Sequence, residues 1–181
     1  MKYLLDIPYY SQHLDIEDER WQSRACGIVC LKMVLDGYKK TDLSVDDLLN
    51  EAISRGAFGD SGWIHNIIVD MAKDLGFLSF RKEWKSEIES IEEILFFEAT
   101  REFIENLLDG QPIIVSTVKN FSEADKFHQV LLTGFEENED GLKGFYYHDP
   151  DSKHREDGKN KFVLLDTFKN NWRKMAIYVK I

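Results

Sequence analysis

The chain has 181 residues, of which 43% are hydrophobic and 13% aromatic, a composition that suits one globular domain over residues 1–181 and excludes a disordered segment. Its formal net charge of −10 at pH 7, with lysine and arginine scattered along the chain, argues against a nucleic-acid partner or binding to an anionic membrane surface. No apolar run is long enough for a transmembrane helix, and two cysteines four positions apart are not a disulfide framework, so we expect a cytoplasmic protein.

Hydrophobic periodicity predicts three helices in the first half of the chain, over residues 26–36, 44–55 and 63–75. A glycine follows each of them, and glycine readily adopts the backbone conformation that ends a helix. The second helix also begins with Ser44 and Asp47, whose spacing is that of a capping box. We therefore expect a helical N-terminal half.

The second half is predicted to consist mainly of strands. A short strand over residues 78–83 and a long amphipathic segment over residues 90–108, which can be one helix or two, lead into it. After Pro112, the pattern predicts strands over residues 113–118, 127–135, 142–148, 162–165 and 175–179, with a short helix at residues 167–172. Helices followed by antiparallel strands predict an α+β fold.

The most informative residue is Cys26, which lies where a polar, irregular stretch becomes the first helix. A cysteine in the first turn of a helix faces unpaired backbone N–H groups and the positive end of the helix dipole, and both favour the thiolate. Cys26 is therefore a candidate nucleophile, the alternative being a small buried hydrophobic residue. Cys30 lies one turn further along in an apolar stretch, where burial keeps a thiol inert.

A cysteine nucleophile needs a base, and His128 is the candidate. It lies in an alternating strand on the same face as Val130 and Leu132, so its imidazole is expected to point into the protein or into a cleft. The alternative is a hydrogen-bonded core histidine without a chemical role. The sequence places three other histidines in polar surroundings, where we expect them to be exposed: His13, His65 and His154.

Two further roles, a residue that orients the base and an oxyanion donor, complete the candidate chemistry. Asp149 ends the next strand, and Pro150 holds it extended, so its carboxylate can orient the His128 imidazole. The alternative is an ordinary Asp-Pro turn. Gln12 and Gln22 both precede the cysteine, and either amide can serve as the neutral donor that stabilises an oxyanion.

These residues, in this order, resemble the bacteriocin-processing (double-glycine) peptidase-like branch of the papain-like cysteine peptidases. That family typically begins with a strand like the one expected here at residues 7–12. The matching segments, in chain order, are residues 7–12, Trp21, Cys26 with Gly27, residues 62–77, 110–115, 128–134 and 146–150, and then Phe168, Trp172 and residues 176–179. The resemblance covers nearly the whole chain and keeps the order of the polar residues.

The resemblance implies a papain-like fold in which an N-terminal helical lobe packs on a C-terminal antiparallel sheet. It implies that Cys26 is the nucleophile, His128 the general base and Asp149 the residue that orients the base. Gln12 would form the oxyanion hole together with the backbone N–H of Cys26. The interval between Gln12 and the cysteine is longer than in the transporter-fused members, which keeps Gln22 as a second candidate.

The function implied is that of a bacterial cysteine peptidase-like hydrolase, which cleaves a peptide or small amide through a thioester acyl-enzyme. We expect no metal and no organic cofactor, because Cys26, Cys30 and His128 lack the spacing and the fourth ligand of a structural zinc site. Two alternatives remain open. The same triad can transfer the acyl group to an amine, as a transamidase or acyltransferase does, or the fold can be a catalytically silent peptide-binding module.

Overall fold

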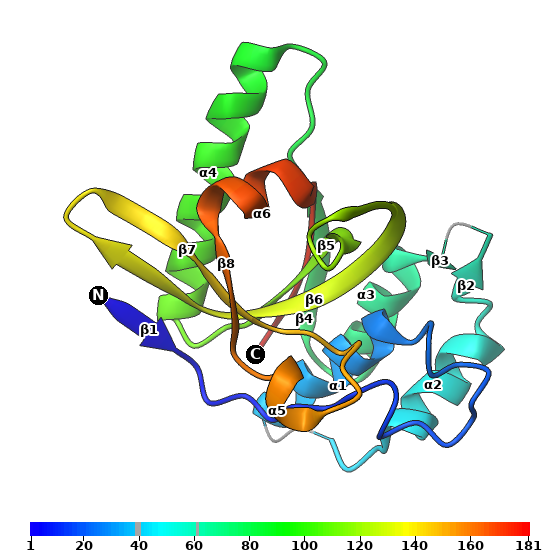
Figure 1. Ribbon diagram of the computed structural model, residues 1–181. Coiled ribbons are helices and arrows are strands. Elements are labelled where there is room, and N and C mark those ends of the chain that lie inside the picture. The colour runs from blue at the N-terminus through cyan, green and yellow to red at the C-terminus, as the bar shows by residue number, and fades with distance from the viewer. Residues whose placement is uncertain (39–40, 61) are drawn as a thin grey trace.

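The computed structural model describes residues 1–38, 41–60 and 62–181 and shows a twisted antiparallel sheet with helices on both faces (Figure 1). The helices are α1 (Cys26–Gly37), α2 (Val45–Ser54), α3 (His65–Asp74), α4 (Glu89–Leu108), α5 (Arg155–Gly158) and α6 (Leu165–Asn171). The strands are β1 (Lys2–Leu4), β2 (Phe58–Gly59), β3 (Gly62–Trp63), β4 (Leu78–Glu83), β5 (Ile113–Lys119), β6 (Glu123–Asn138), β7 (Gly141–His148), β8 (Lys161–Leu164) and β9 (Trp172–Lys180). The predicted α+β fold is confirmed.

The main sheet has the strand order β4-β9-β5-β6-β7-β8, and the short β1 pairs with β6 at one end. All these pairings are antiparallel, and β2 and β3 form a separate two-stranded ribbon. In the register of β6 and β7, Leu131 lies opposite His148. The chain beyond His148 therefore returns beside the stretch of β6 that carries His128.

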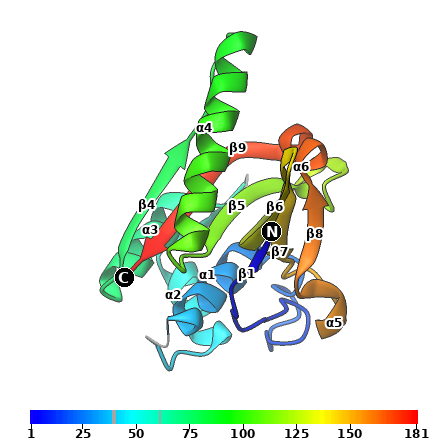
Figure 2. The ribbon, with the colours of Figure 1, turned by 90° about the vertical axis from the view of Figure 1, so that its left-hand side faces the viewer.

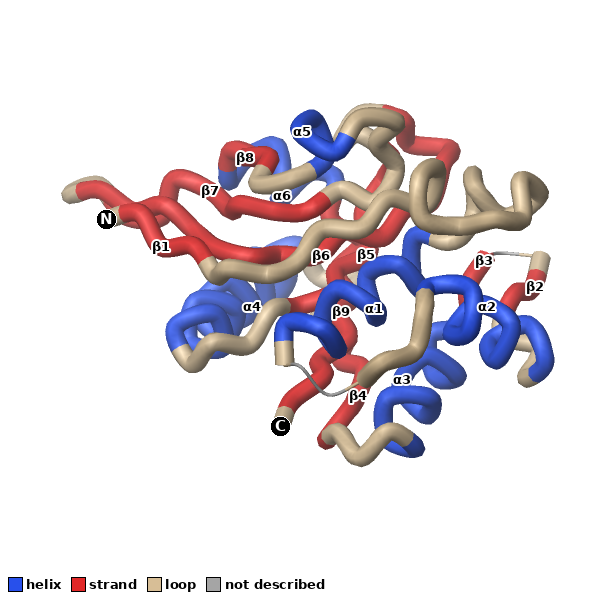
Figure 3. The backbone as a smooth tube through the Cα atoms, turned by 90° about the horizontal axis from the view of Figure 1, so that it is seen from below, coloured by secondary structure: helices blue, strands red, loops and turns tan. Residues whose placement is uncertain are grey.

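Two hydrophobic clusters cover the two faces of the sheet. Side chains alternate between the faces of a strand, so Ile114 and Leu131 belong to the cluster with α1, α2 and α3, whereas Ile113 and Leu132 belong to the cluster with α4 and α6. Figure 2 shows α4 crossing one face of the sheet and extending beyond it, and Figure 3 shows α1 with α2 and α3 beside it.

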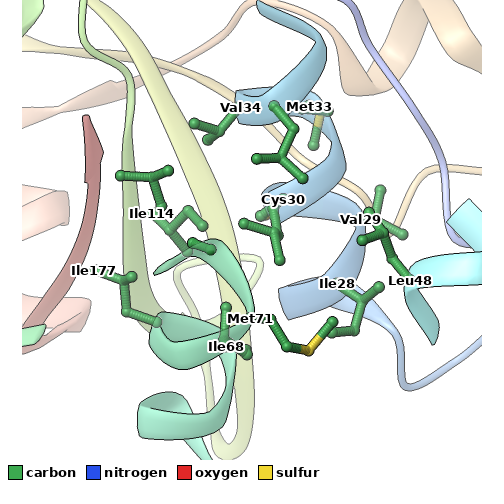
Figure 4. Packing of buried hydrophobic residues seen from close by; sticks show 14 of the residues in the cluster. Ile28, Val29, Cys30, Met33, Val34, Leu48, Ile68, Met71, Ile114 and Ile177 are labelled. Atoms are coloured by element: carbon green, nitrogen blue, oxygen red, sulfur yellow. The ribbon is translucent and has the colours of Figure 1, made fainter. Parts of the chain in front are cut away.

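Helix α1 is the central helix of the first cluster. Every residue from Cys26 to Leu35 is buried, as expected of a helix that contacts neighbours on all sides. Figure 4 shows side chains of α1 packing between α2 and α3 and toward the sheet: Ile28, Val29, Cys30, Met33 and Val34 against Leu48, Ile68, Met71, Ile114 and Ile177. This packing holds the start of α1, and with it Cys26, in one position.

Most predicted elements are confirmed, including the capping box, in which Ser44 accepts a hydrogen bond from the backbone N–H of Asp47 and the Asp47 side chain accepts one from that of Ser44. The amphipathic segment at residues 90–108 is one helix, α4. The third helix begins at His65 rather than at Trp63, because Gly62–Trp63 pairs with Phe58–Gly59. None of the helices among the described residues has the length and apolar character needed to cross a bilayer.

The prediction of a strand at residues 7–12 is wrong. Residues 7–11 are irregular, residue 12 lies in a turn, and the strand in this part of the chain is β1. Polar groups at the end of this segment instead bond to the loop after β7: the Gln12 backbone N–H donates to the Pro150 carbonyl (2.8 Å), and Ser11 Oγ donates to the Ser152 carbonyl (2.5 Å). These long-range bonds take the place of a sheet ladder.

Candidate active site

Cys26 is the first residue of α1 and lines a cleft of about 370 Å³. The residue before it, Ala25, has no polar side chain, so no side chain at this position caps the backbone N–H groups of the first helical turn. Gly27 lets the helix approach the sheet closely, since a Cβ there would lie 2.1 Å from Oε1 of the buried Gln129 and would force that side chain to shift. The start of α1 therefore places a thiol and the helix dipole together at the cleft.

An aromatic cluster holds the loop that leads to Cys26. The indole Nε1 of Trp63 donates to the Arg24 carbonyl (2.5 Å), and the Trp21 ring packs against Phe58 and Trp63 with centroids 5.2 and 5.8 Å apart. Phe58 and Trp63 also line the cleft. The ribbon of β2 and β3 thus forms one wall of the site and fixes the approach to the thiol.

His128 lies between Cys26 and Asp149, as the sequence predicts. Its side chain is 5% exposed, and Nε2 is 2.8 Å from Oδ1 of Asp149, while the ring also forms a hydrogen bond with Cys26. Burial by itself lowers the pKa of His128, but the hydrogen bonds with Asp149 and Cys26 outweigh it and raise the pKa to about 10. The raised pKa depends on a negative charge on both partners, Asp149 and Cys26, so the imidazolium is favoured at neutral pH when Cys26 is a thiolate.

Asp149 is buried and accepts hydrogen bonds at both oxygens. Oδ1 accepts from His128 and from the backbone N–H of Asp151 (3.1 Å), and Oδ2 accepts from Nζ of Lys161 (2.9 Å). Burial by itself raises the pKa of this carboxyl, but the hydrogen bond and charge of His128, together with the Lys161 ammonium, hold it well below its usual range. Tyr9 donates to the Asp149 carbonyl (2.8 Å), which fixes the backbone as well.

Lys161 is a functional candidate that sequence reasoning missed. It lies opposite Tyr147 in the pairing of β7 and β8, and this register brings its ammonium back to the carboxylate just beyond β7. A lone lysine in an alternating strand carries no signal for such a contact. Only the pairing of the two strands could have indicated it.

The structure places Gln12, and not Gln22, at the cleft. Gln12 is 1% exposed and lines the cleft, and its Nε2 donates to Oδ1 of Asp151 (2.6 Å). The amide of Gln22 donates instead to the Ile16 carbonyl (2.8 Å), within its own loop. Of the two glutamines, only Gln12 is among the residues that surround Cys26.

Two histidines that were expected to be exposed are partly buried. His13 lies with Nε2 2.7 Å from Oδ1 of Asp151, and His65 lines the cleft. Burial lowers the pKa of His65 to about 4, and the charge of Arg81 acts in the same direction, so this ring is neutral at pH 7. His154 is exposed, as predicted.

The remaining histidine, His148, is also accounted for. It donates to the Ile7 carbonyl (3.0 Å) and accepts from the Asn160 backbone N–H (3.1 Å), so both ring nitrogens are used inside the protein. It therefore serves as a buried structural residue. Among the described residues, no group of three or more His, Cys, Asp or Glu side chains is arranged to hold a metal ion.

We expect iodoacetamide to modify Cys26 and to leave Cys30 unmodified in the folded protein. Cys30 is fully buried with Sγ 3.6 Å from the Gln129 carbonyl, and burial, with the charges of Cys26 and Asp149, raises its pKa well above the usual value. Peptide mass spectrometry after labelling at near-neutral and mildly acidic pH measures this, with the unfolded protein as control for Cys30. Preferential modification of Cys30, or none in the folded protein, would contradict a nucleophilic Cys26.

Comparison with known proteins gives one family and a consistent fold. The model of the Peptidase_C39 like family matches residues 4–179. A search of curated proteins gave no significant match.

Three solved structures share the fold over most or all of their length. A C39-like peptidase from Bacillus anthracis is 18% identical, covers 100% of this chain and 98% of its own, and superposes with a TM-score of 0.68. A double glycine motif protease from an AMS/PCAT transporter, solved in complex with the leader peptide, is 15% identical. The match covers 100% of this chain and 99% of the protease, with a TM-score of 0.60. The peptidase domain of Streptococcus ComA, a bi-functional ABC transporter involved in quorum sensing, is 21% identical. The match covers 87% of this chain and 91% of that domain, with a TM-score of 0.55.

Proposed function

The chain belongs to the Peptidase_C39 like family and is a cysteine peptidase of papain-like fold, and we propose that Cys26, His128 and Asp149 form its catalytic triad. The observation that carries this proposal is the continuous buried chain from the thiol through the imidazole to the carboxylate. A thiol nucleophile, a base within hydrogen-bond reach and a third group that orients the base are what acyl transfer by cysteine requires.

The proposed reaction begins with transfer of the Cys26 proton to His128, which gives a thiolate and an imidazolium. The thiolate attacks the carbonyl carbon of the substrate, and Gln12 Nε2 and the backbone N–H of Cys26 stabilise the oxyanion. His128 then gives its proton to the leaving amine, and a thioester remains on Cys26. His128 next removes a proton from a water molecule, which attacks the thioester and releases the acid. Asp149 stabilises the imidazolium throughout.

We propose a peptide as the substrate and a bacterial cytoplasm as the location. The double glycine motif protease with the same fold binds a leader peptide, which supports a peptide substrate here. The cleft is lined by the rings of Phe58, Trp63 and Phe127, which suit peptide side chains. One domain over residues 1–181 agrees with two clusters that pack on opposite faces of the same sheet.

A peptidyl electrophile that reacts with thiolates tests the proposed nucleophile and base. We expect an adduct at Cys26, located by mass spectrometry, that is absent in Cys26→Ala and strongly reduced in His128→Ala, because the imidazolium maintains the thiolate. Cys30→Ala is the matched control and should label like the wild type.

The same experiment separates the alternatives. A folded protein that resists a panel of such electrophiles would be a peptide-binding module. A protein that labels with an activated acyl ester, and then loses the acyl group faster to added amines than to water, would be a transamidase or acyltransferase.

A further inference from the structure

The carboxylate of Asp151 lies in the cleft beside the proposed triad, although it is not part of it. Its Oδ1 accepts from Nε2 of Gln12 (2.6 Å) and lies 2.7 Å from Nε2 of His13, and it forms an ion pair with Lys119. The side chain is 9% exposed. A carboxylate with this many donors around it is held in one orientation.

Gln12 needs such a partner because its amide has two ends of similar shape. Only Nε2 can donate to an oxyanion, whereas Oε1 in the same place would repel it. Oε1 of Gln12 is buried and, in the described part of the chain, has no hydrogen-bond partner that could orient the amide. The bond to Asp151 is therefore the contact that fixes the positions of Nε2 and Oε1 of Gln12.

A carboxylate suits this task because it only accepts hydrogen bonds. Nε2 must face it, and the second hydrogen of the same NH₂ group is left for the cleft. The ammonium of Lys119 offsets the negative charge of Asp151, so that charge need not oppose an oxyanion forming nearby. Burial by itself raises the pKa of Asp151, but the bonds with Lys119 and His13 lower it, which keeps the carboxylate ionised.

The same short segment also anchors the triad. The backbone N–H of Asp151 donates to Oδ1 of Asp149 (3.1 Å), and the Pro150 carbonyl accepts from the Gln12 backbone N–H (2.8 Å). The residue that orients the base and the residue that holds the amide are thus two positions apart. A displacement of this segment would move both.

We propose that Asp151 is a positioning residue of the oxyanion hole, which acts by fixing the direction of the Gln12 amide. The proposal rests on the proposed function of the site. In this role the Asp151 carboxylate orients the Gln12 amide and does not transfer a proton.

The test compares two reactions of the Cys26 thiol in the intact chain. Acylation by p-nitrophenyl acetate passes through a tetrahedral oxyanion, whereas alkylation by iodoacetamide does not, so only the first depends on the oxyanion hole. We expect Asp151→Ala to slow acylation by about tenfold or more, in line with the loss of a hydrogen bond to a charged group, and to leave alkylation near the wild-type rate. Asp151→Asn keeps a carbonyl oxygen that can accept the bond but adds an NH₂ group that can face the wrong end of the Gln12 amide. Its acylation rate should therefore lie between those of the wild type and Asp151→Ala.

Coupling to Gln12 is the decisive measurement. In Gln12→Ala, the added Asp151→Ala change should cause no further loss of acylation, because the residue that Asp151 positions is absent. Asp15→Ala is the matched control: its carboxylate accepts from the Ser11 backbone N–H of the same loop (2.7 Å) and pairs with Arg155, whereas the Gln12 amide donates to Asp151.

The other outcomes overturn the proposal in distinguishable ways. Equal losses of acylation and alkylation would mean that Asp151 only maintains structure, and additive losses in the double variant would mean that it acts independently of Gln12. An unchanged acylation rate in both Asp151 variants would also overturn it. Wild-type protein that reacts with neither reagent would instead contradict the proposed function. Circular dichroism and thermal melting verify folding, and Asp151→Asn provides the test if Asp151→Ala does not fold.

Discussion

Replacement of His128 by alanine is expected to lower turnover by about 10⁴-fold or more, because a triad base acts in both halves of the reaction. His128 bonds to Asp149 on one side and to Cys26 on the other, so its removal leaves the thiol without its proton acceptor and the leaving amine without its acid. Steady-state hydrolysis of a cleavable peptide or activated ester measures the loss. Alkylation of Cys26 at neutral pH should slow as well, since the imidazolium no longer stabilises the thiolate.

The control for this prediction is His154→Ala, which removes an exposed imidazole and should retain wild-type turnover. Circular dichroism should show both variants folded. A loss below about tenfold in His128→Ala would mean that another base serves the thiol, given that removal of a true triad member costs orders of magnitude. His65, which also lines the cleft, would then be the residue to test next.

Gln12→Ala is expected to lower turnover by about 100–1,000-fold, the usual cost of removing one oxyanion-hole donor. The loss should be mainly in kcat, because the donor acts on charge that develops in the transition state. Alkylation of Cys26 by iodoacetamide should change little, since that reaction forms no oxyanion. Kinetics of ester or peptide hydrolysis beside alkylation rates measure the difference.

Gln22→Ala is the matched control, because its amide bonds to the Ile16 carbonyl away from the cleft. It should keep turnover near the wild-type value. If Gln22→Ala instead shows the large loss and Gln12→Ala does not, the oxyanion donor is Gln22 and the proposed role of Gln12 is wrong.

The elements that could be predicted are those whose signals lie within a few residues. The capping box at Ser44 and the strand over residues 78–83 were found where the sequence placed them. Errors occurred where pairing with another segment decided the outcome. Residues 7–12 look like a strand, but Ser11 and Gln12 bond to the loop after β7. The start of α3 was misplaced because Gly62–Trp63 pairs with the nearby Phe58–Gly59.

In the candidate site, too, some residues could be predicted from the sequence and others only from the fold. The resemblance named Cys26, His128, Asp149 and Gln12, and the structure brings these four residues around one cleft or directly behind it, while their catalytic roles stay predictions. The contact of Lys161 with Asp149 was not predicted, because a lysine in a strand is expected to be solvated unless the strand pairing is known.

The sequence by itself determined that α1 begins at Cys26, that Cys30 lies on the apolar body of that helix, and that antiparallel strands follow, because backbone capping and side-chain periodicity act within one or two turns. Only the tertiary structure showed which of Gln12 and Gln22 lies at the cleft, since two amides of identical chemistry differ only in their surroundings. Gln12 meets Asp151, a residue 139 positions away, whereas Gln22 bonds within its own loop. Contacts between such distant residues depend on strand register and loop packing, which no local pattern records.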